Sequence, residues 1–328
     1  MLKSLFALLF FTAALGPAIG DARAQPASTW RPDRPVRVIV PTAAGGSLDF
    51  VGRAFAQGLS ADMGQSFVVV NRPGANGSIA ISEALRADAD GHTLILVTTT
   101  MVAVNPAIYR DLKYDALKDF APVGTLAVVP AVLVAALNFP ANDARELVAL
   151  AKSKPNELNY ASTGAGAFSN LTFEMLKERA GINIVHVPYK GESDSLVEIM
   201  AGRASVAILT LASALPFIND KRIKALGVLS PQRLSVLPQV PTMEEQGFNG
   251  FNPQLWYGVV AAKGTAPNVI SAYQVAVDRM LAKPELQANF AKQSLVPLVS
   301  NPAEFTSRMT ADIALYGAVV KSAGIRVE

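Results

Sequence analysis

The feature that most limits the possible folds is a strand, a glycine-rich turn and a helix in direct succession, which occurs once in each half of the chain. In the first half, a β-branched run at 36–40 leads into the turn 42–47, and a helical pattern of apolar residues follows. In the second half, a short strand at 159–161 leads into the turn 162–166 and another helical pattern. This repeated order predicts an α/β protein whose mainly parallel sheets are flanked by helices.

The remaining sequence continues the alternation of strands and helices. The proline-rich stretch at 231–241 is predicted to be a connector. Asn301 followed by Pro302 is typical of the start of a helix. Further strands are predicted at 67–70, 93–97, 184–188, 206–209, 223–228 and 256–261, and helices at 47–59, 78–87, 143–153, 169–180, 191–202, 268–283 and 302–323.

Length and composition fit two lobes and exclude several classes of function. The chain has 328 residues, of which 51% are hydrophobic and 17% charged, so it can bury more than one core. Its 29 Lys and Arg against 26 Asp and Glu give a net charge of only +3, and no basic run points to a nucleic-acid partner. Without cysteine, and with only His92 and His186, the chain lacks the residues for thiol catalysis or a His-rich zinc site. We therefore expect no metal and no cofactor.

The first 24 residues have the features of a secretory signal peptide. Lys3 precedes an apolar run at 5–15, and Ala22-Arg23-Ala24 provides small residues around a cleavage site. We therefore predict export to the periplasm and cleavage near Ala24. The apolar run is too short to favour a transmembrane anchor.

The two glycine-rich turns are the candidate binding sites. In open α/β sheets, ligands lie beyond the carboxyl ends of the strands, where helix N-termini provide free N–H groups that favour an anion. Ser47 and Ser169 are expected to cap their helices, which would leave Ser162 and Thr163 free to bind. Asp49 either complements the helix dipole or touches the ligand. The alternative is that both turns only connect strand to helix.

Catalysis is the main alternative to simple binding. No nucleotide-binding loop, nucleophile elbow or zinc-protease motif occurs in the sequence. A hydrolase would have to use Ser162 or Ser78 with His186 as the base. His186 alternates with apolar residues in a predicted strand, so we expect it to be structural, and we expect no catalytic residues.

Several short motifs occur in the order seen in a known family. In addition to the turn at 41–49, they are NRPGANG at 71–77, NPAIY at 105–109, VPYKG at 187–191, VPT at 240–242 and WYGVVA at 256–261. The chain thereby resembles the Bug-type extracytoplasmic solute receptors, the binding components of tripartite tricarboxylate transporters. The resemblance covers essentially the whole chain after the signal segment. It implies a two-lobed periplasmic-binding-protein fold of type II, with a small carboxylate held in a cleft between the lobes.

The resemblance also implies a division of the chain and a set of partners. Lobe one would comprise 25–126 and 229–328, and lobe two would comprise 127–228. The protein would be a monomer that closes on its ligand by hinge motion and serves membrane permease subunits, or alternatively a sensor kinase. The ligand-binding residues would be Thr42, Gly45, Gly46, Ser47, Asp49, Thr99 and Thr100 from the first lobe, and Ser162, Thr163, Gly164 and Asn170 from the second.

The chain departs from the pattern of the family in three places. Thr42 and Ala44 stand where relatives often have an aromatic residue and a proline, and Asn170 stands where many have histidine. Many relatives also have an acidic residue near Leu209, and this chain has none there. The missing carboxylate argues against a ligand that carries an ammonium group.

Overall fold

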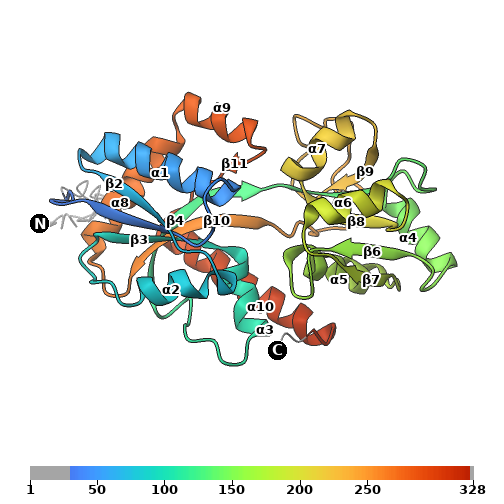
Figure 1. Cartoon of the computed structure of the whole chain (residues 1–328), viewed down its shortest axis with the longest axis horizontal. Coiled ribbons are helices and arrows are strands. Elements are labelled where there is room, and N and C mark those ends of the chain that lie inside the picture. The colour runs from blue at the N-terminus through green and yellow to red at the C-terminus, as the bar shows by residue number, and fades with distance from the viewer. Residues whose placement is uncertain (1–29, 326–328) are drawn as a thin grey trace, which may run out of the picture.

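The computed structural model describes residues 30–325, so the predicted signal segment lies outside the described residues. Figure 1 shows two lobes side by side, each built around its own β-sheet. Within residues 30–325, no helix combines the length and apolar character needed to cross a membrane.

The sheet of the first lobe contains six strands in the order β11-β4-β10-β3-β1-β2. Strand β1 pairs in parallel with β2 and β3, whereas β10 runs antiparallel to β3 and β4, and β11 antiparallel to β4. The strands are β1 (Val36–Val40), β2 (Phe67–Asn71), β3 (Thr93–Thr98), β4 (Phe120–Val129), β10 (Leu255–Ala262) and β11 (Val296–Pro297).

Helices cover both faces of this sheet because its strands alternate apolar side chains between two cores. Val38 and Leu94 pack on one face, and Ile39 and Ile95 on the other. The first face is covered by α1 (Ser47–Met63), α8 (Pro267–Leu281) and α9 (Pro284–Lys292), and the second by α2 (Ser78–Ala84), the π-helix η2 (Thr100–Val104) and α10 (Pro302–Ser322). The short helices η1 (Ala75–Gly77) and α3 (Asn105–Ile108) complete the lobe.

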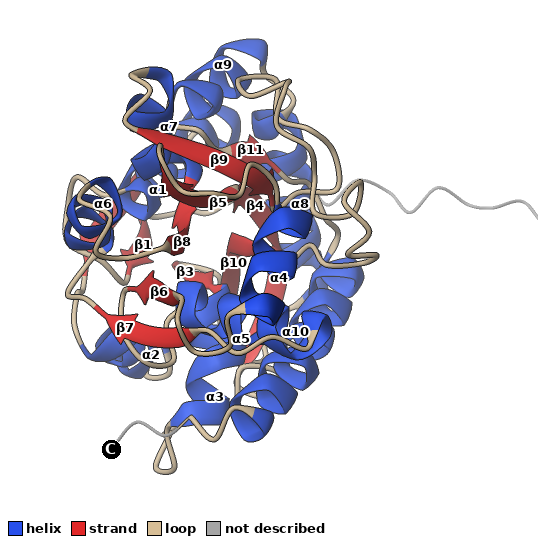
Figure 2. Ribbon diagram, turned by 90° about the vertical axis from the view of Figure 1, so that its right-hand side faces the viewer, coloured by secondary structure: helices blue, strands red, loops and turns tan. Residues whose placement is uncertain are grey.

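The sheet of the second lobe contains five strands in the order β7-β6-β8-β5-β9. Strand β6 is parallel to β7 and β8, and β5 is antiparallel to β8 and β9. Figure 2 looks onto this lobe, with helices on both sides of its sheet. The strands are β5 (Ala131–Ala136), β6 (Asn159–Ser162), β7 (Val185–Pro188), β8 (Val206–Thr210) and β9 (Ile223–Val228). The helices are α4 (Ala144–Ser153) and α5 (Phe168–Ala180) on one face and α6 (Glu192–Met200) and α7 (Leu211–Asn219) on the other.

The two-lobed α/β architecture agrees with expectation, but the prediction of mainly parallel sheets is wrong in detail. Both sheets are mixed, because β4 and β5 run antiparallel to their neighbours. The sequence did not indicate these two strands. The run 120–136 is buried almost throughout, so it lacks the alternation of a half-exposed strand, and Pro122 and Pro130 argue against a strand.

Two extended segments cross between the lobes. The first crossing is at Pro130, between β4 and β5. The second is at residues 252–254, because Phe251 belongs to a core of the second lobe and β10 starts at Leu255. The connector after β9 therefore packs on the second lobe. The predicted division, which assigned the residues from 229 onwards to lobe one, differs from this packing. Its apolar side chains, including Met243, fill the space beside that sheet.

A third tie between the lobes comes from the C-terminal helix. Tyr316 and Val319 of α10 share a buried cluster with Leu171 of α5. The Ser322 hydroxyl also donates a hydrogen bond of 3.1 Å to Glu178. Two crossing segments and one packed helix thus set how the lobes lie relative to one another.

Candidate functional site

A cavity of about 420 Å³ lies between the lobes, and we call it the cleft. Its volume falls within the range of about 300–1,000 Å³ that is usual for sites that bind small molecules. Side chains and backbone from both lobes form its walls. The lining residues are Asn76, Thr100, Ile108, Tyr109 and Leu255 from the first lobe, and Thr163, Ala165, Gly166, Ala167, Phe168, Ser169, Glu192, Ile208, Leu209 and Thr210 from the second lobe.

The second glycine-rich turn, residues 162–166, forms one wall of the cleft. Gly164 and Gly166 have φ angles of 122° and 75°, which side-chain-bearing residues rarely adopt. The Gly166 N–H donates to Oδ1 of Asn170 at 2.9 Å, and the Thr163 N–H donates to the Ser169 hydroxyl at 3.2 Å. These contacts fix the turn from the side of the helix.

Helix α5 starts directly after this turn without a capping side chain. Its N-cap is Ala167, so the prediction that Ser169 caps the helix is wrong. The Ser169 hydroxyl instead accepts from the turn, as described above. The first N–H groups of a helix have no partner within it, so this uncapped start offers donors beside the cleft.

A network of aromatic and polar side chains supports the second turn. The Ser162 hydroxyl contacts Nε2 of His186 at 2.6 Å, and the His186 ring stacks on Tyr160 with 4.9 Å between the ring centroids. The Tyr160 hydroxyl accepts from Asn170 at 2.7 Å and donates to Glu174 at 2.5 Å. Burial lowers the pKa of His186, and it raises the pKa of Tyr160. Both rings are thereby favoured in their uncharged forms.

The first glycine-rich turn, residues 42–47, is held by Asp49. The carboxylate accepts from the Gly45 N–H, from the Asn71 amide and from Arg53, each at 2.9 Å. Burial alone raises the pKa of Asp49, but the hydrogen bonds from Arg53, Gly45 and Asn71 outweigh it and lower the pKa to about 2. All of these contacts are with other parts of the protein, so the role of Asp49 is to fix the shape of the turn.

The other predicted residues of the first lobe have different surroundings. The Ser47 hydroxyl contacts the Tyr257 hydroxyl at 2.7 Å and does not cap α1, whose N-cap is Gly46. The buried Thr99 hydroxyl accepts from the Trp256 N–H at 2.9 Å and donates to the Gln254 carbonyl at 3.3 Å. These two side chains attach the first turn and β3 to β10.

The structure brings part of the predicted set together around the cleft. Thr100 and Thr163 line it from opposite lobes. Ser162 and Asn170 are buried directly behind the lining, with their polar atoms committed to the turn. The residues of the first turn, Thr42, Gly45 and Gly46 among them, do not line this cavity.

Glu192 is a cleft residue that the sequence analysis missed. It is the first residue of α6, and its carboxylate accepts from the Thr210 N–H at 2.8 Å and from the Thr210 hydroxyl at 2.6 Å. The Ser213 hydroxyl also donates to it. The signal in the sequence was an acid directly after Gly191, at the start of the helix that follows VPYKG.

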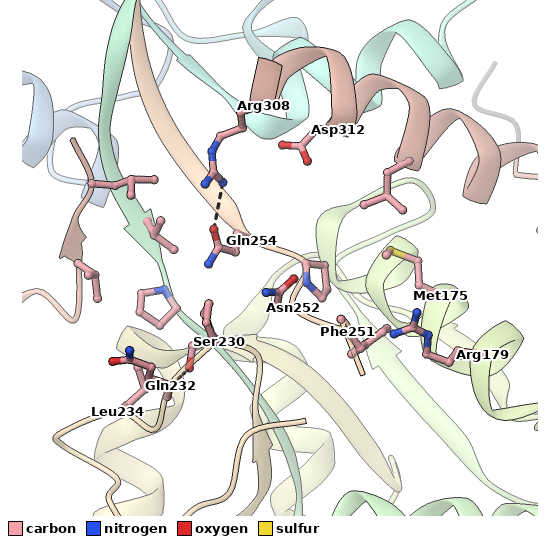
Figure 3. A pocket seen from close by; sticks show the side chains of 18 of the residues that line it. Met175, Arg179, Ser230, Gln232, Leu234, Phe251, Asn252, Gln254, Arg308 and Asp312 are labelled. Atoms are coloured by element: carbon pink, nitrogen blue, oxygen red, sulfur yellow. Dashed lines mark hydrogen bonds between the residues drawn. The ribbon is translucent and has the colours of Figure 1, made fainter. Parts of the chain in front are cut away.

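A larger cavity of about 1140 Å³ lies beside the two crossings, and Figure 3 shows its lining. Arg308 donates to the Gln254 side chain at 3.0 Å there, and Asp312 accepts from the Trp256 indole at 2.6 Å. Burial raises the pKa of Asp312, although Trp256 and Arg308 oppose the shift. None of the predicted site residues lines this cavity, so the cleft is the better candidate for the ligand site.

The described residues contain no group of three or more His, Asp or Glu side chains that is placed to hold a metal ion. The cleft thus presents backbone N–H groups, hydroxyls, an amide and one carboxylate. This donor and acceptor set suits hydrogen bonding to a small polar molecule.

Comparison with known proteins places the chain among transport receptors. A model of the family described as "Tripartite tricarboxylate transporter family receptor" matches residues 51–325. Protein BugT of Bordetella pertussis is 31% identical over 298 residues, which span 90% of this chain and 91% of BugT. The structure of Rpa4515 of R. palustris with adipate is 32% identical with a TM-score of 0.76, and it covers 90% of this chain and 99% of that chain. The structure of MatC of Rhodopseudomonas palustris with bound malate is 28% identical with a TM-score of 0.71, over 88% of this chain and 99% of that chain.

Proposed function

The chain belongs to the tripartite tricarboxylate transporter receptor family, and from that premise we propose that it is a periplasmic solute-binding protein that captures a small carboxylate between its lobes. It then presents the ligand to membrane permease subunits. No covalent chemistry takes place, and the receptor acts as a monomer.

The observation that carries this proposal is the cleft of about 420 Å³ with the uncapped start of α5 at its wall. Free N–H groups and the positive end of the helix dipole favour an anion. The relatives with adipate and malate, both carboxylates, support the same ligand chemistry.

We assign the ligand contacts to residues on both sides of the cleft. The amides after Gly166 and the Thr163 hydroxyl bind the carboxylate, and Thr100 contacts the ligand from the first lobe. Ser162, Asn170 and Asp49 act indirectly, because they hold the two turns in shape. Ser47, Gly45 and Gly46 approach the ligand when the lobes close.

Closure is a rotation about the two crossings. The lobes are joined at Pro130 and at residues 252–254, where few residues need to change their backbone angles. A ligand that contacts both lobes stabilises the closed form, because its full set of contacts exists only in that form. Among the described residues, lobe one then comprises 30–129 and 255–325, and lobe two comprises the segment between 130 and 254. Residues 1–24 are removed on export.

Hydrolysis is a weaker explanation of the same residues. Ser162 and His186 are in contact at 2.6 Å, but the Ser162 side chain is fully buried and its hydroxyl also accepts from the Gly164 N–H at 3.1 Å. A nucleophile must reach its substrate, so the pair is better explained as support for the turn.

A thermal-shift screen of the chain without residues 1–24 tests the proposal, after unfolding and refolding to remove any bound ligand. A carboxylate at 100 times its Kd should stabilise the protein by about 2.7 kcal/mol, which corresponds to roughly 5 °C at this size. Ala165→Phe, which fills the exposed lining position, should abolish the shift. The matched control Ala291→Phe, at an exposed position of α9, should retain it.

The proposal is overturned if mono-, di- and tricarboxylates, aromatic acids and amino acids all leave the melting temperature unchanged. It is also overturned if Ala165→Phe responds to the ligand as the unmodified protein does, because the site would then lie elsewhere.

A further inference from the structure

We propose that Glu192 makes this receptor selective for a carboxylate whose far end carries an ammonium group. The inference rests on the proposed function, since it concerns the ligand held in the same cleft. It reverses the expectation drawn from the sequence, where the missing acid near Leu209 argued against such a ligand.

The structure restores a carboxylate to that place from a different element. Strand β8 ends at Thr210, and the Glu192 side chain reaches this end from the start of α6. Both Glu192 oxygens are held there, one by the Thr210 N–H at 2.8 Å and the other by the Thr210 hydroxyl at 2.6 Å. Ser213 adds a further donor from α7. Three donors fix the carboxylate in one position, as expected for a group that selects a ligand.

The charge of the cleft makes this carboxylate decisive. Glu192 is the sole Asp, Glu, Lys, Arg or His among the described residues that line the cavity. A ligand with two carboxylates would bring a second negative charge beside it with no Lys or Arg in the lining to compensate. A ligand with an ammonium group at that end would instead form an ion pair with Glu192. Hydrogen bonds from a cationic donor to a carboxylate are stronger than those between neutral groups.

The two ends of such a ligand have separate places in the second lobe. The amides of the turn after β6 are neutral donors for the carboxylate, and Glu192 lies beyond β8, the neighbouring strand. On β10 of the first lobe, the Tyr257 hydroxyl is bonded to Ser47 at 2.7 Å. Glu192 is near enough to contribute to the raised pKa of Tyr257, after burial as the main cause.

Length-matched pairs of acids test the inference by isothermal titration calorimetry on the refolded protein without residues 1–24. The pairs are glutarate with 5-aminopentanoate and adipate with 6-aminohexanoate. In the unmodified protein, the amino acid of at least one pair should bind at least 10-fold more tightly than its dicarboxylate. Glu192→Gln should remove or reverse this preference, because it keeps the shape and removes the charge.

Two control variants separate the charge from the structure around it. Asp194→Asn makes the same change in charge in the first turn of the same helix, on an exposed side chain outside the cleft lining, and should keep the preference. Ser213→Ala removes one donor to Glu192 and keeps its charge, so it should also keep the preference. If Glu192→Gln fails to fold, Glu192→Asp, which retracts the charge, should reduce the preference.

The possible failures are distinguishable. Tighter binding of both dicarboxylates, unchanged in Glu192→Gln, overturns the inference and leaves the receptor function in place. Absence of binding for these four acids and for the whole carboxylate panel overturns the proposed function itself.

Discussion

The two lobes hold their glycine-rich turns with the same construction but with different chemistry. In the first lobe, the Gly45 N–H donates to the Asp49 side chain, and in the second, the Gly166 N–H donates to the Asn170 side chain. Both contacts span four residues and measure 2.9 Å. We call each contact the turn brace of its lobe. The first brace is a carboxylate, and the second is a neutral amide.

This difference decides which turn is the better site for an anion. Asp49 places a negative charge at the first turn, and that charge already receives three hydrogen bonds from the protein. Asn170 holds the second turn without any charge, so the dipole of α5 is not offset there. The second turn, and not the first, also lines the cleft.

Removal of the charged brace should have the largest effect on stability. Asp49→Ala removes a buried carboxylate and leaves the Gly45 N–H and one Asn71 contact without their acceptor, and we expect a loss of about 3 kcal/mol in the free energy of unfolding. Urea unfolding of the ligand-free protein measures it. Arg53→Ala is the control, because its half-exposed guanidinium forms a surface ion pair worth at most about 1 kcal/mol. Equal losses in the two variants would contradict the role of Asp49 as a brace.

The same brace should respond to strong acid. The pKa of Asp49 falls from 3.8 to about 2 on folding, so its contribution is complete above pH 3.8 and is lost as the pH falls towards 2. The lost contribution is about 2 kcal/mol. Asp49→Asn should unfold with a smaller change in stability between pH 4 and pH 2 than the unmodified protein. A pH profile identical in the two proteins would mean that the carboxylate does not titrate with folding.

Removal of the neutral brace should cost less than removal of the charged one. Asn170→Ala deletes the acceptor of the Gly166 N–H and one donor to the Tyr160 hydroxyl, and we expect a loss of about 1.5 kcal/mol. Carboxylate affinity should fall more in this variant than in Asp49→Ala, because the second turn lines the cleft. Parallel urea unfolding and calorimetry with a ligand found in the screen test both points. A larger loss of affinity in Asp49→Ala would reverse the assignment of the anion site.

The sequence was sufficient to predict both turns because strand, turn and helix are encoded locally. The start of α10 is an example, since Asn301 and Glu304 form the capping box typical of a helix start. The braces were not predictable in their roles. Whether Asp49 and Asn170 face a ligand or the N–H of a preceding glycine depends on side-chain direction, which composition does not reveal.

Contacts between distant segments were the other part that sequence could not provide. Glu192 becomes a cleft residue only because α6 brings it to Thr210, 18 residues further along the chain. The connector after β9 was expected in lobe one, yet Phe251 packs in the core of the second lobe. Both outcomes depend on how distant segments pack against the sheet of the second lobe, in which the pattern of apolar residues did not indicate the interior strand β5.

The smallest effect expected is a response of the second lobe to mild acid. Burial lowers the pKa of His186 below its ordinary 6.5, so the unfolded chain takes up a proton before the folded protein does. Stability should therefore fall as the pH drops from 7.5 to 5.5, with a slope from this group of at most about 1.4 kcal/mol per pH unit. His186→Gln should show a smaller fall than the unmodified protein in urea unfolding at the two pH values.

Asp49→Asn is the matched control for this prediction, because Asp49 titrates near pH 2 and its replacement should leave the change between pH 7.5 and 5.5 intact. If His186→Gln kept the full change, the ring beneath the second turn would not be the group that titrates. If the change is reduced only in His186→Gln, mild acid lowers the stability of the second lobe, which has the neutral brace, and leaves the first lobe, with its charged brace, unaffected. The second turn, which has no charged brace, is then also the turn more sensitive to proton uptake, because the His186 ring is in contact with Ser162 at its start.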